Sequence, residues 1–215
     1  MQKRTLNRAI TSALATGTAI ALTAGVTPAT AAEPGTTSLV EVLNADGDKF
    51  DKNWSDFDIV QRAVVTVLGA KPESAVGVLA DGSQALTAFV PTDRAFRKLA
   101  TELTGEKPAG EKATFKALAA AVPDVDTLEA VLLYHVVPGA TITYKQAKQA
   151  DGAELTTASG GTITVKVTGK GRVVLKDADT DDTNPRVIVP LRNINKGNLQ
   201  IAHGIDRVLR PIDLP

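Results

Sequence analysis

The hydrophobic periodicity changes halfway along the chain, and this change constrains the fold more than any other feature. In the first half, apolar residues such as Ile59, Ala63 and Val67 recur at helical spacing. In the second half, Thr162-Ile-Thr-Val-Lys-Val-Thr168 alternates strictly, as a half-buried strand does. Helices first and antiparallel strands later predict an α+β domain and argue against a repeated βαβ unit.

The same patterns place the individual elements. We expect four helices: one capped by Asp56 and ended by Gly69, one capped by Thr92 and followed by Gly105, one over 112–122, and one from Asp126 or Thr127 into His135. We expect strands at 86–90, 162–168, 172–176, 186–189 and 199–209, with a hairpin turn at 169–171.

The N-terminus has the layout of a secretory signal peptide. Three basic residues precede a weakly apolar stretch from Ala9 to Val26, and small residues follow at 29–32. We expect cleavage after Ala32, with Ala31 as the alternative. Thr, Ser and Gly dilute the stretch, which argues against a retained membrane-spanning anchor.

Removal of residues 1–32 leaves a short linker at 33–37, a single domain at 38–211 and a C-terminal tail at 212–215. The chain has no cysteine, so we expect neither disulfides nor thiolate metal sites. Its net charge is zero and the leader is basic, so the mature chain is slightly acidic and lacks the basic footprint of a nucleic-acid-binding protein. We expect a secreted monomer with no membrane span after cleavage and no C-terminal anchor.

Three segments resemble the signatures of fasciclin-like domains. They are Thr87–Phe96 (TAFVPTDRAF), Leu132–Gly139 (LLYHVVPG) and Ala202–Pro211 (AHGIDRVLRP), in the family's order and spacing. The resemblance implies a β-sandwich or wedge of about seven mainly antiparallel strands with helices packed against it. It also implies a secreted bacterial adhesion or interaction module, not an enzyme, whose partner is an unknown extracellular protein or a cell-surface or matrix component.

Two departures from the family stand out. The stretch between Leu39 and Leu86 looks long and carries an acidic insert at 44–58 that contains Trp54. Gly204 stands where the closing signature usually has a branched apolar residue, and we expect it to loosen that strand locally. Trp54 is either a lid over the helix that follows it or a contact residue for a partner, since large aromatic residues serve both purposes.

Tyr134 and His135 are the first candidate binding residues. The resemblance implies a contribution to receptor binding, as in animal relatives. The alternative, which we favour, is that both rings are buried and hydrogen-bonded. Asp93 is the expected partner of His135, because it sits in the first turn of its helix, where a carboxylate suits the helix dipole.

The remaining signature residues are expected to be structural. Thr92, Asp93 and Phe96 belong to the first signature, and His203 and Asp206 belong to the last. His203 and Asp206 are three residues apart, so on a strand they would point to opposite faces and could not act together.

No residue pattern supports catalysis or strong metal binding. No serine lies in a nucleophile elbow, and two histidines are too few for the usual three-histidine zinc centre. Asp177-x-Asp179-x-Asp181 and Asn44-x-Asp46-x-Asp48 begin like calcium loops, but both lack the loop's glycine and bidentate glutamate. We expect no enzyme, no metal and no cofactor, and weak calcium binding stays open.

Two functions stay open as well. An adhesion module would offer an exposed patch near Trp54 or Tyr134, with apolar and aromatic residues inside a polar rim. A carrier of a small apolar ligand would enclose a ligand-sized apolar pocket between the sandwich and the early helices.

Overall fold

The computed structural model describes residues 33–212, apart from 48 and 123. The expected signal peptide therefore lies outside the described residues. The elements in chain order are α1 (Leu39–Leu43), α2 (Asp58–Ala70), β1 (Leu86–Pro91), α3 (Asp93–Thr104), α4 (Glu111–Ala121), α5 (Val125–Tyr134), β2 (Val136–Pro138), α6 (Tyr144–Ala147), β3 (Glu154–Thr156), β4 (Thr162–Val167), β5 (Val173–Lys176) and β6 (Gln200–Ile205). Short 3₁₀ segments occur at η1 (Asn44–Asp46), η2 (Ala75–Ala80) and η3 (Val189–Leu191).

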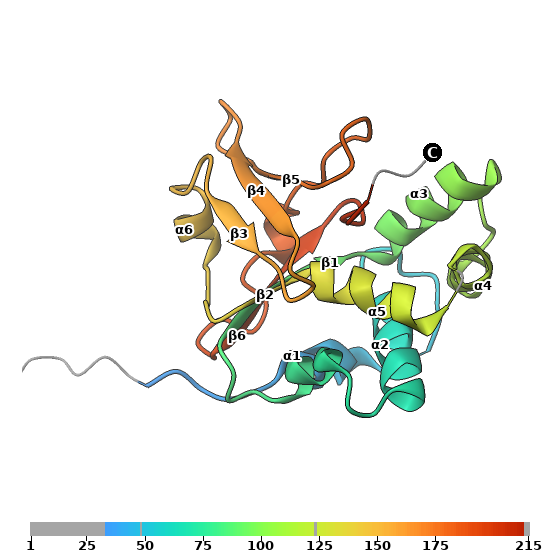
Figure 1. Cartoon of the computed structure of the whole chain (residues 1–215), viewed down its shortest axis with the longest axis horizontal. Coiled ribbons are helices and arrows are strands. Elements are labelled where there is room, and N and C mark those ends of the chain that lie inside the picture. The colour runs from blue at the N-terminus through green and yellow to red at the C-terminus, as the bar shows by residue number, and fades with distance from the viewer. Residues whose placement is uncertain (1–32, 48, 123, 213–215) are drawn as a thin grey trace, which may run out of the picture. The chain divides into compact units, whose positions relative to one another are not determined.

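The strands form two three-stranded sheets, with orders β2–β1–β6 and β3–β4–β5. β1 pairs antiparallel with β2 but parallel with β6, in a register that places Ala88 opposite Ala202. In Figure 1, α2, α3, α4 and α5 gather on one side of β1, and the β3–β4–β5 sheet lies on the other. The predicted α+β class is confirmed, but the described residues contain six strands where about seven were expected.

The β2–β1–β6 sheet, here called the central sheet, separates two apolar cores. β1 and β6 are buried along their whole lengths. On β1, Ala88 and Val90 pack in the core on the side of the helices, the helix-side core. Phe89 packs in the second core with Ile163 and Leu175 of the β3–β4–β5 sheet, here called the outer sheet. A strand buried on both faces has a nearly continuous apolar sequence, which explains why this one does not alternate.

The outer sheet confirms the predicted hairpin, since β4 and β5 pair with Val165 opposite Leu175. The strand predicted over 186–189 is wrong. There, Arg186 and Val187 make only isolated bridges, and the chain turns into η3. Pro185 and Pro190 flank this segment, and a proline has a fixed φ and no N–H to donate to a ladder.

Two helix starts are capped by distant parts of the chain. Asp56 does not cap α2, whose N-cap is Phe57 with no side-chain cap bond. Instead, the Ile59 N–H of α2 donates to Asp93 Oδ1 at 2.9 Å. Thr92 is the N-cap of α3 as predicted, but its hydroxyl makes no cap bond. At the start of α3, the Asp93 and Arg94 N–H groups donate to the carbonyl oxygens of Asp56 and Trp54, each at 3.1 Å. Both helix starts thus use tertiary contacts for N–H groups that lack a partner within the helix, and no local pattern reveals such contacts.

Gly204 does not loosen β6. It pairs in register with Val90, and a Cβ built on it would lie 2.7 Å from Leu191 Cβ and 3.4 Å from Phe57 Cζ. Its missing side chain therefore allows η3 and the insert to pack directly on the strand.

Replacing Gly204 with valine should therefore lower the free energy of unfolding by about 1–3 kcal/mol, because the added atoms overpack a filled site. Urea unfolding followed by circular dichroism measures the change. Gly69→Ala in α2 is the matched control: nothing lies within 4 Å of its Cβ, so that variant should gain up to about 1 kcal/mol. Equal stability of Gly204→Val and the wild type would contradict the close packing.

Candidate functional site

Tyr134 and His135 both lie in the interior. Tyr134 is 1% exposed and donates its hydroxyl hydrogen to the carbonyl oxygen of Thr162 at 2.9 Å. His135 Nδ1 lies 2.8 Å from the carbonyl oxygen of Val131, and Nε2 accepts from the Leu209 N–H at 2.9 Å. These two contacts assign the neutral tautomer with its proton on Nδ1. A partner could reach either ring only if the fold opened.

The expected pairing of Asp93 with His135 is wrong. Both ring nitrogens of His135 contact backbone groups, and Asp93 Oδ1 accepts from Ile59 N–H. Asp93 instead belongs to a group of carboxylates. The sequence placed it correctly in a first helical turn but could not show which other helix start it faces.

The neutral state of His135 makes its contribution to stability depend on pH. Burial lowers the pKa of His135 to about 4 from its ordinary value of 6.5. The folded state therefore binds fewer protons than the unfolded state between these values, so this contribution is complete above pH 6.5 and falls as the pH drops towards 4. Burial lowers the pKa of His203 as well, so His203 acts in the same direction.

Between pH 7.5 and pH 4.5, His135 should account for a loss of about 2–3 kcal/mol. Asp93 and Asp177 oppose this loss, because burial raises the pKa of each. The test therefore compares the free energies of unfolding of the wild type and His135→Asn, each measured by urea unfolding at both pH values. The wild type should lose more stability than the variant when the pH falls. An identical pH response in the two proteins would contradict the assignment.

His203 and Asp206 of the closing signature also form hydrogen bonds within the fold. His203 is 1% exposed; its Nδ1 accepts from Asn193 N–H at 3.2 Å and its Nε2 lies 2.8 Å from the carbonyl oxygen of Ile142. Asp206 accepts from Arg186 N–H at 2.8 Å. His203 and Asp206 thus have separate backbone partners, and neither is arranged for acid–base chemistry. Phe96 is buried in the helix-side core.

Trp54 packs on α3. Arg97 Cζ lies 4.2 Å from the centre of the indole ring, a cation–π distance, and the Trp54 carbonyl oxygen accepts from Arg94 N–H at 3.1 Å. Trp54 was expected to cover α2, but its contacts are with Arg94 and Arg97 of α3. The ring is half-buried, so it is not a prominent contact residue.

The insert brings carboxylates to the point where three helices begin. Asp58, Asp93 and Glu111 are the first residues of α2, α3 and α4. The carboxylates form two groups of three, one with Asp56, Asp58 and Asp93 and the other with Asp51, Asp56 and Glu111. Within each group, one carboxylate oxygen of every residue lies within 4.8 Å of the others. Burial, with the neighbouring Asp56, raises the pKa of Asp93 to about 8, and burial raises that of Glu111. Of this group, Asp93 stood out in the sequence as a signature residue and Asp56 only as a helix cap.

The aspartate-rich loop at 177–182, one of the two calcium-loop candidates, is held by arginine. Asp179 Oδ2 accepts from Arg210 Nη1 at 2.9 Å, and Asp182 Oδ2 lies 3.2 Å from Arg210 Nη2. Glu102 of α3 contacts the same guanidinium. Two of the carboxylates thus already have a cation, Arg210 of the closing signature.

A basic face surrounds Tyr144. Lys148 Nζ and Arg192 Cζ each lie 5.6 Å from the centre of the Tyr144 ring, and the Tyr144 hydroxyl lies 3.4 Å from the carbonyl oxygen of Gly171 at the tip of the β4–β5 hairpin. Lys170 and Arg172 flank that glycine and are exposed. We call Lys148, Lys170, Arg172 and Arg192, with the ring they surround, the Tyr144 face.

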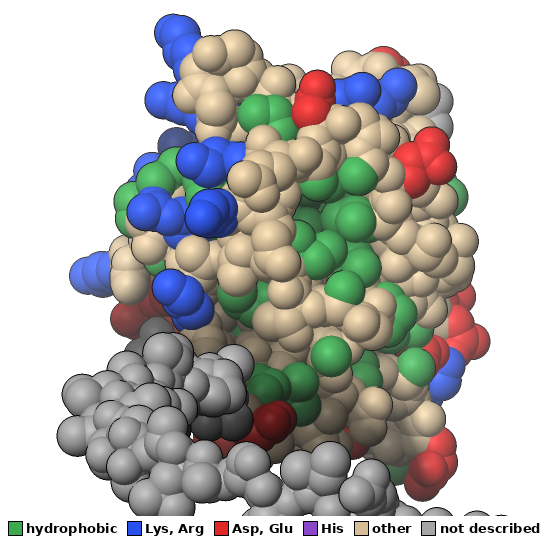
Figure 2. Space-filling view, turned by 90° about the vertical axis from the view of Figure 1, so that its left-hand side faces the viewer, with side chains coloured by type: hydrophobic (Ala, Val, Ile, Leu, Met, Phe, Trp, Pro, Cys, Tyr) green, Lys and Arg blue, Asp and Glu red, His purple; other side chains and the backbone are tan. Residues whose placement is uncertain are grey.

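Figure 2 views the molecule from the side that α6 occupies in Figure 1 and shows Lys and Arg side chains gathered on this side, beside a strip of hydrophobic side chains. The net charge of the whole chain does not reveal this face. The two ranges 139–176 and 183–198 together carry nine basic and two acidic residues, whereas 33–138 carries sixteen acidic and ten basic. A charge count by segment would have found the separation.

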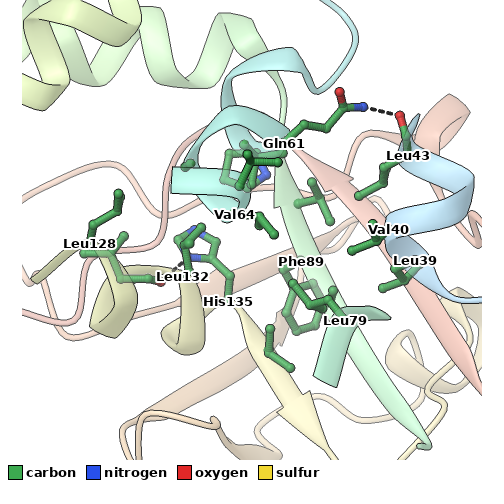
Figure 3. Close-up of a pocket in the computed structure, with 18 of the residues that line it drawn as sticks. Leu39, Val40, Leu43, Gln61, Val64, Leu79, Phe89, Leu128, Leu132 and His135 are labelled. Carbon is green, nitrogen blue, oxygen red and sulfur yellow. Dashed lines mark hydrogen bonds between the residues drawn. The ribbon is translucent and has the colours of Figure 1, made fainter. Parts of the chain in front are cut away.

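An apolar cavity of about 80 Å³ lies among α1, α2, α5 and β1. In Figure 3, Leu39 and Val40 of α1 face Val64 of α2, and Leu128 and Leu132 of α5 line the opposite end. Gln61 closes one edge by donating to the Leu43 carbonyl oxygen. Pockets for drug-sized ligands usually hold about 300–1,000 Å³, so the cavity offers no support for a carrier. Among the described residues, no helix has the length and apolar character that crossing a bilayer requires.

The comparisons with known proteins agree with this architecture. Among solved structures, the chain is similar to the FAS1 domain pair of the insect cell adhesion molecule Fasciclin I, with a TM-score of 0.52 and 17% sequence identity. The match covers 82% of this chain and 51% of the other, so the chain spans about half the length of that structure. At this identity the likeness concerns the fold. No curated protein is significantly similar to the chain. The fasciclin domain family matches residues 65–211, and the chain therefore belongs to the fasciclin family.

Proposed function

We propose that this protein is exported through its N-terminal leader and acts outside the cytoplasm as a non-catalytic, monomeric interaction module that uses the Tyr144 face. Fasciclin domains are in general extracellular or surface-associated adhesion or interaction modules. The observation that carries the proposal is the convergence of Lys148, Arg192 and the hairpin tip on one tyrosine ring.

The chemistry of this face favours an anionic partner. Clustered Lys and Arg side chains raise the local concentration of negatively charged groups and speed their association at low salt. Arginine and lysine over an aromatic ring are held in place by cation–π attraction, which reduces the ordering that binding would otherwise require. We therefore propose a cell-surface or matrix polymer with repeated carboxylate, sulfate or phosphate groups as the partner.

In this proposal the Tyr-His motif acts through the core. The bonds of Tyr134 to Thr162 and of His135 to Leu209 hold α5 against the outer sheet and the end of the chain. Trp54 holds the insert against α3 through its contact with Arg97. None of the three is needed as a direct contact.

The test is binding to an immobilised polyanion, dextran sulfate, with uncharged dextran as the reference surface. The variant Lys148→Glu/Arg172→Glu/Arg192→Glu should lose at least about tenfold in affinity, and wild-type binding should weaken steeply between 0.05 and 0.5 M salt, because these charges are exposed to screening. The control is Lys107→Glu/Lys116→Glu, which reverses two exposed lysines in and beside α4. It should bind as the wild type does.

A loss in the control that is in proportion to its two reversed charges would show that overall charge, and not this face, attracts the polymer. Binding that is indifferent to salt and to the triple variant would overturn the proposal altogether. Circular dichroism of each variant confirms that the fold is retained, since all five replaced side chains are exposed.

A further inference from the structure

We propose that the carboxylates at the starts of α2, α3 and α4 form a Ca²⁺-binding site made of two adjoining groups that share Asp56, with Asp93 as the buried ligand of one group and Glu111 as that of the other. The site lies apart from the Tyr144 face and does not depend on the proposed function.

Asp56 belongs to two groups of three carboxylates, one with Asp58 and Asp93 and one with Asp51 and Glu111. Within each group, the candidate ligand atoms lie within 4.8 Å of one another. Oxygens around one Ca²⁺ ion lie at 2.3–2.6 Å from it, so opposite ligands are separated by up to about 5 Å. Each group therefore matches the span of one coordination sphere.

The buried carboxylates Asp93 and Glu111 each have one oxygen without a hydrogen-bond partner. Asp93 is 0% exposed and Glu111 is 1% exposed. Each has one oxygen that accepts a backbone hydrogen bond, from Ile59 and Asp51 respectively. The other oxygen of each, Asp93 Oδ2 and Glu111 Oε1, is buried without a hydrogen-bond partner. A buried carboxylate oxygen with no donor is costly, and a coordinated cation would remove that cost.

In the part of the chain that the structure describes, no lysine or arginine forms an ion pair with Asp93 or Glu111. The loop at 177–182 shows the contrast, because Arg210 occupies that carboxylate group. Helix dipoles favour acidic residues at helix starts, but they leave the two buried oxygens without a partner.

The ligand set selects the ion. Only carboxylate oxygens are present in the two groups, and hard oxygen ligands suit Ca²⁺ or Mg²⁺ better than transition metals. Mg²⁺ requires near-ideal octahedral geometry at 2.0–2.1 Å and gives up its water reluctantly, so a crowded, buried carboxylate set favours Ca²⁺. Extracellular modules bind Ca²⁺ with Kd of about 10⁻⁴–10⁻³ M.

The first experiment measures thermal unfolding of the purified full chain with 10 mM CaCl₂ or with EGTA. At about 10–100 times such a Kd, Ca²⁺ should raise the melting temperature by roughly 3–10 °C. The variant Asp93→Asn/Glu111→Gln keeps the size and one acceptor oxygen of each side chain and should lose this increase. Glu73→Gln, which neutralises an exposed carboxylate outside the cluster, should keep it. MgCl₂ should give a smaller shift than CaCl₂.

A second readout reports binding without relying on stability. Trp54 is the only tryptophan of the chain and lies within the insert, so its excitation should sensitise Tb³⁺, a luminescent Ca²⁺ substitute. Ca²⁺ should displace the signal from wild type, and Asp93→Asn/Glu111→Gln should show none. The proposal is overturned if Ca²⁺ neither stabilises the wild type nor competes with Tb³⁺. It is equally overturned if the double variant responds as the wild type does, or if neutralisation raises stability while Ca²⁺ has no effect, which would indicate carboxyls that share a proton.

Discussion

Replacing Arg210 with alanine should lower the free energy of unfolding by about 3–5 kcal/mol, the usual cost of removing one partner from a buried ion pair. The Arg210 side chain is 8% exposed and that of Asp179 is 0% exposed. The variant would leave Asp179 without its cation and beside Asp182, so two carboxylates would repel one another in a poorly solvated place.

The measurement is urea unfolding at pH 7, with Arg207→Ala as the matched control. Arg207 contacts Glu102 at 2.8 Å and Asp182 at 3.4 Å, but its side chain is 23% exposed. Partly exposed pairs contribute little, so this control should cost about 1 kcal/mol or less. Similar losses in the two variants would contradict the special position of Arg210.

The same pair predicts a response to acid. Burial alone would raise the pKa of Asp179, but hydrogen bonds from Arg210, Asp181 and Asp182 hold this pKa at about 2, below its ordinary value of 3.8. The unfolded state therefore binds more protons between these values, and the contribution of this pair is complete above pH 4 and lost as the pH falls towards 2.

Replacing Tyr134 with alanine should cost about 3–5 kcal/mol, because it removes a large aromatic ring from the core. Tyr134 is among the largest fully buried side chains of the described residues. Gly161 packs directly on it: a Cβ there would lie 2.7 Å from Tyr134 Cε2. The ring is thus enclosed on the side of the outer sheet, where its hydroxyl also meets Thr162.

Tyr134→Phe separates packing from hydrogen bonding. It keeps the ring and removes only the hydroxyl, so it should cost about 0.5–1.5 kcal/mol. Both variants are followed by urea unfolding, and the folded fraction of each is tested on dextran sulfate. Wild-type affinity per folded molecule is expected for both. A stable Tyr134→Ala protein with lost binding would return this residue to the contact surface.

The sequence predicted those elements whose signals are local. The positions of α3, α4 and the β4–β5 hairpin follow from periodicity, Gly105 and the turn at 169–171, and all lie within a few residues of their expected ends. The parallel pairing of β1 with β6 could not be predicted in this way, because it joins residues such as Ala88 and Ala202 that are far apart in the sequence.

The candidate sites also differ in whether the sequence shows them locally. The roles of Asp93 and Glu111 depend on three helix starts meeting at the insert, and each start alone looks like an ordinary acidic first turn. The Tyr144 face, in contrast, left a visible trace in the sequence, because basic residues dominate 139–176 and 183–198. A net charge of zero concealed it. The signal-peptide assignment and the expected bacterial origin stay predictions from sequence and resemblance.

Amine labelling of the wild-type protein with and without dextran sulfate, read by mass spectrometry, shows whether the Tyr144 face is the contact surface. Lys148 and Lys170 should become protected from labelling on binding, while Lys107 and Lys116, which are also exposed, should label as before. Uniform protection of all four lysines, or protection confined to Lys107 and Lys116, would contradict this prediction.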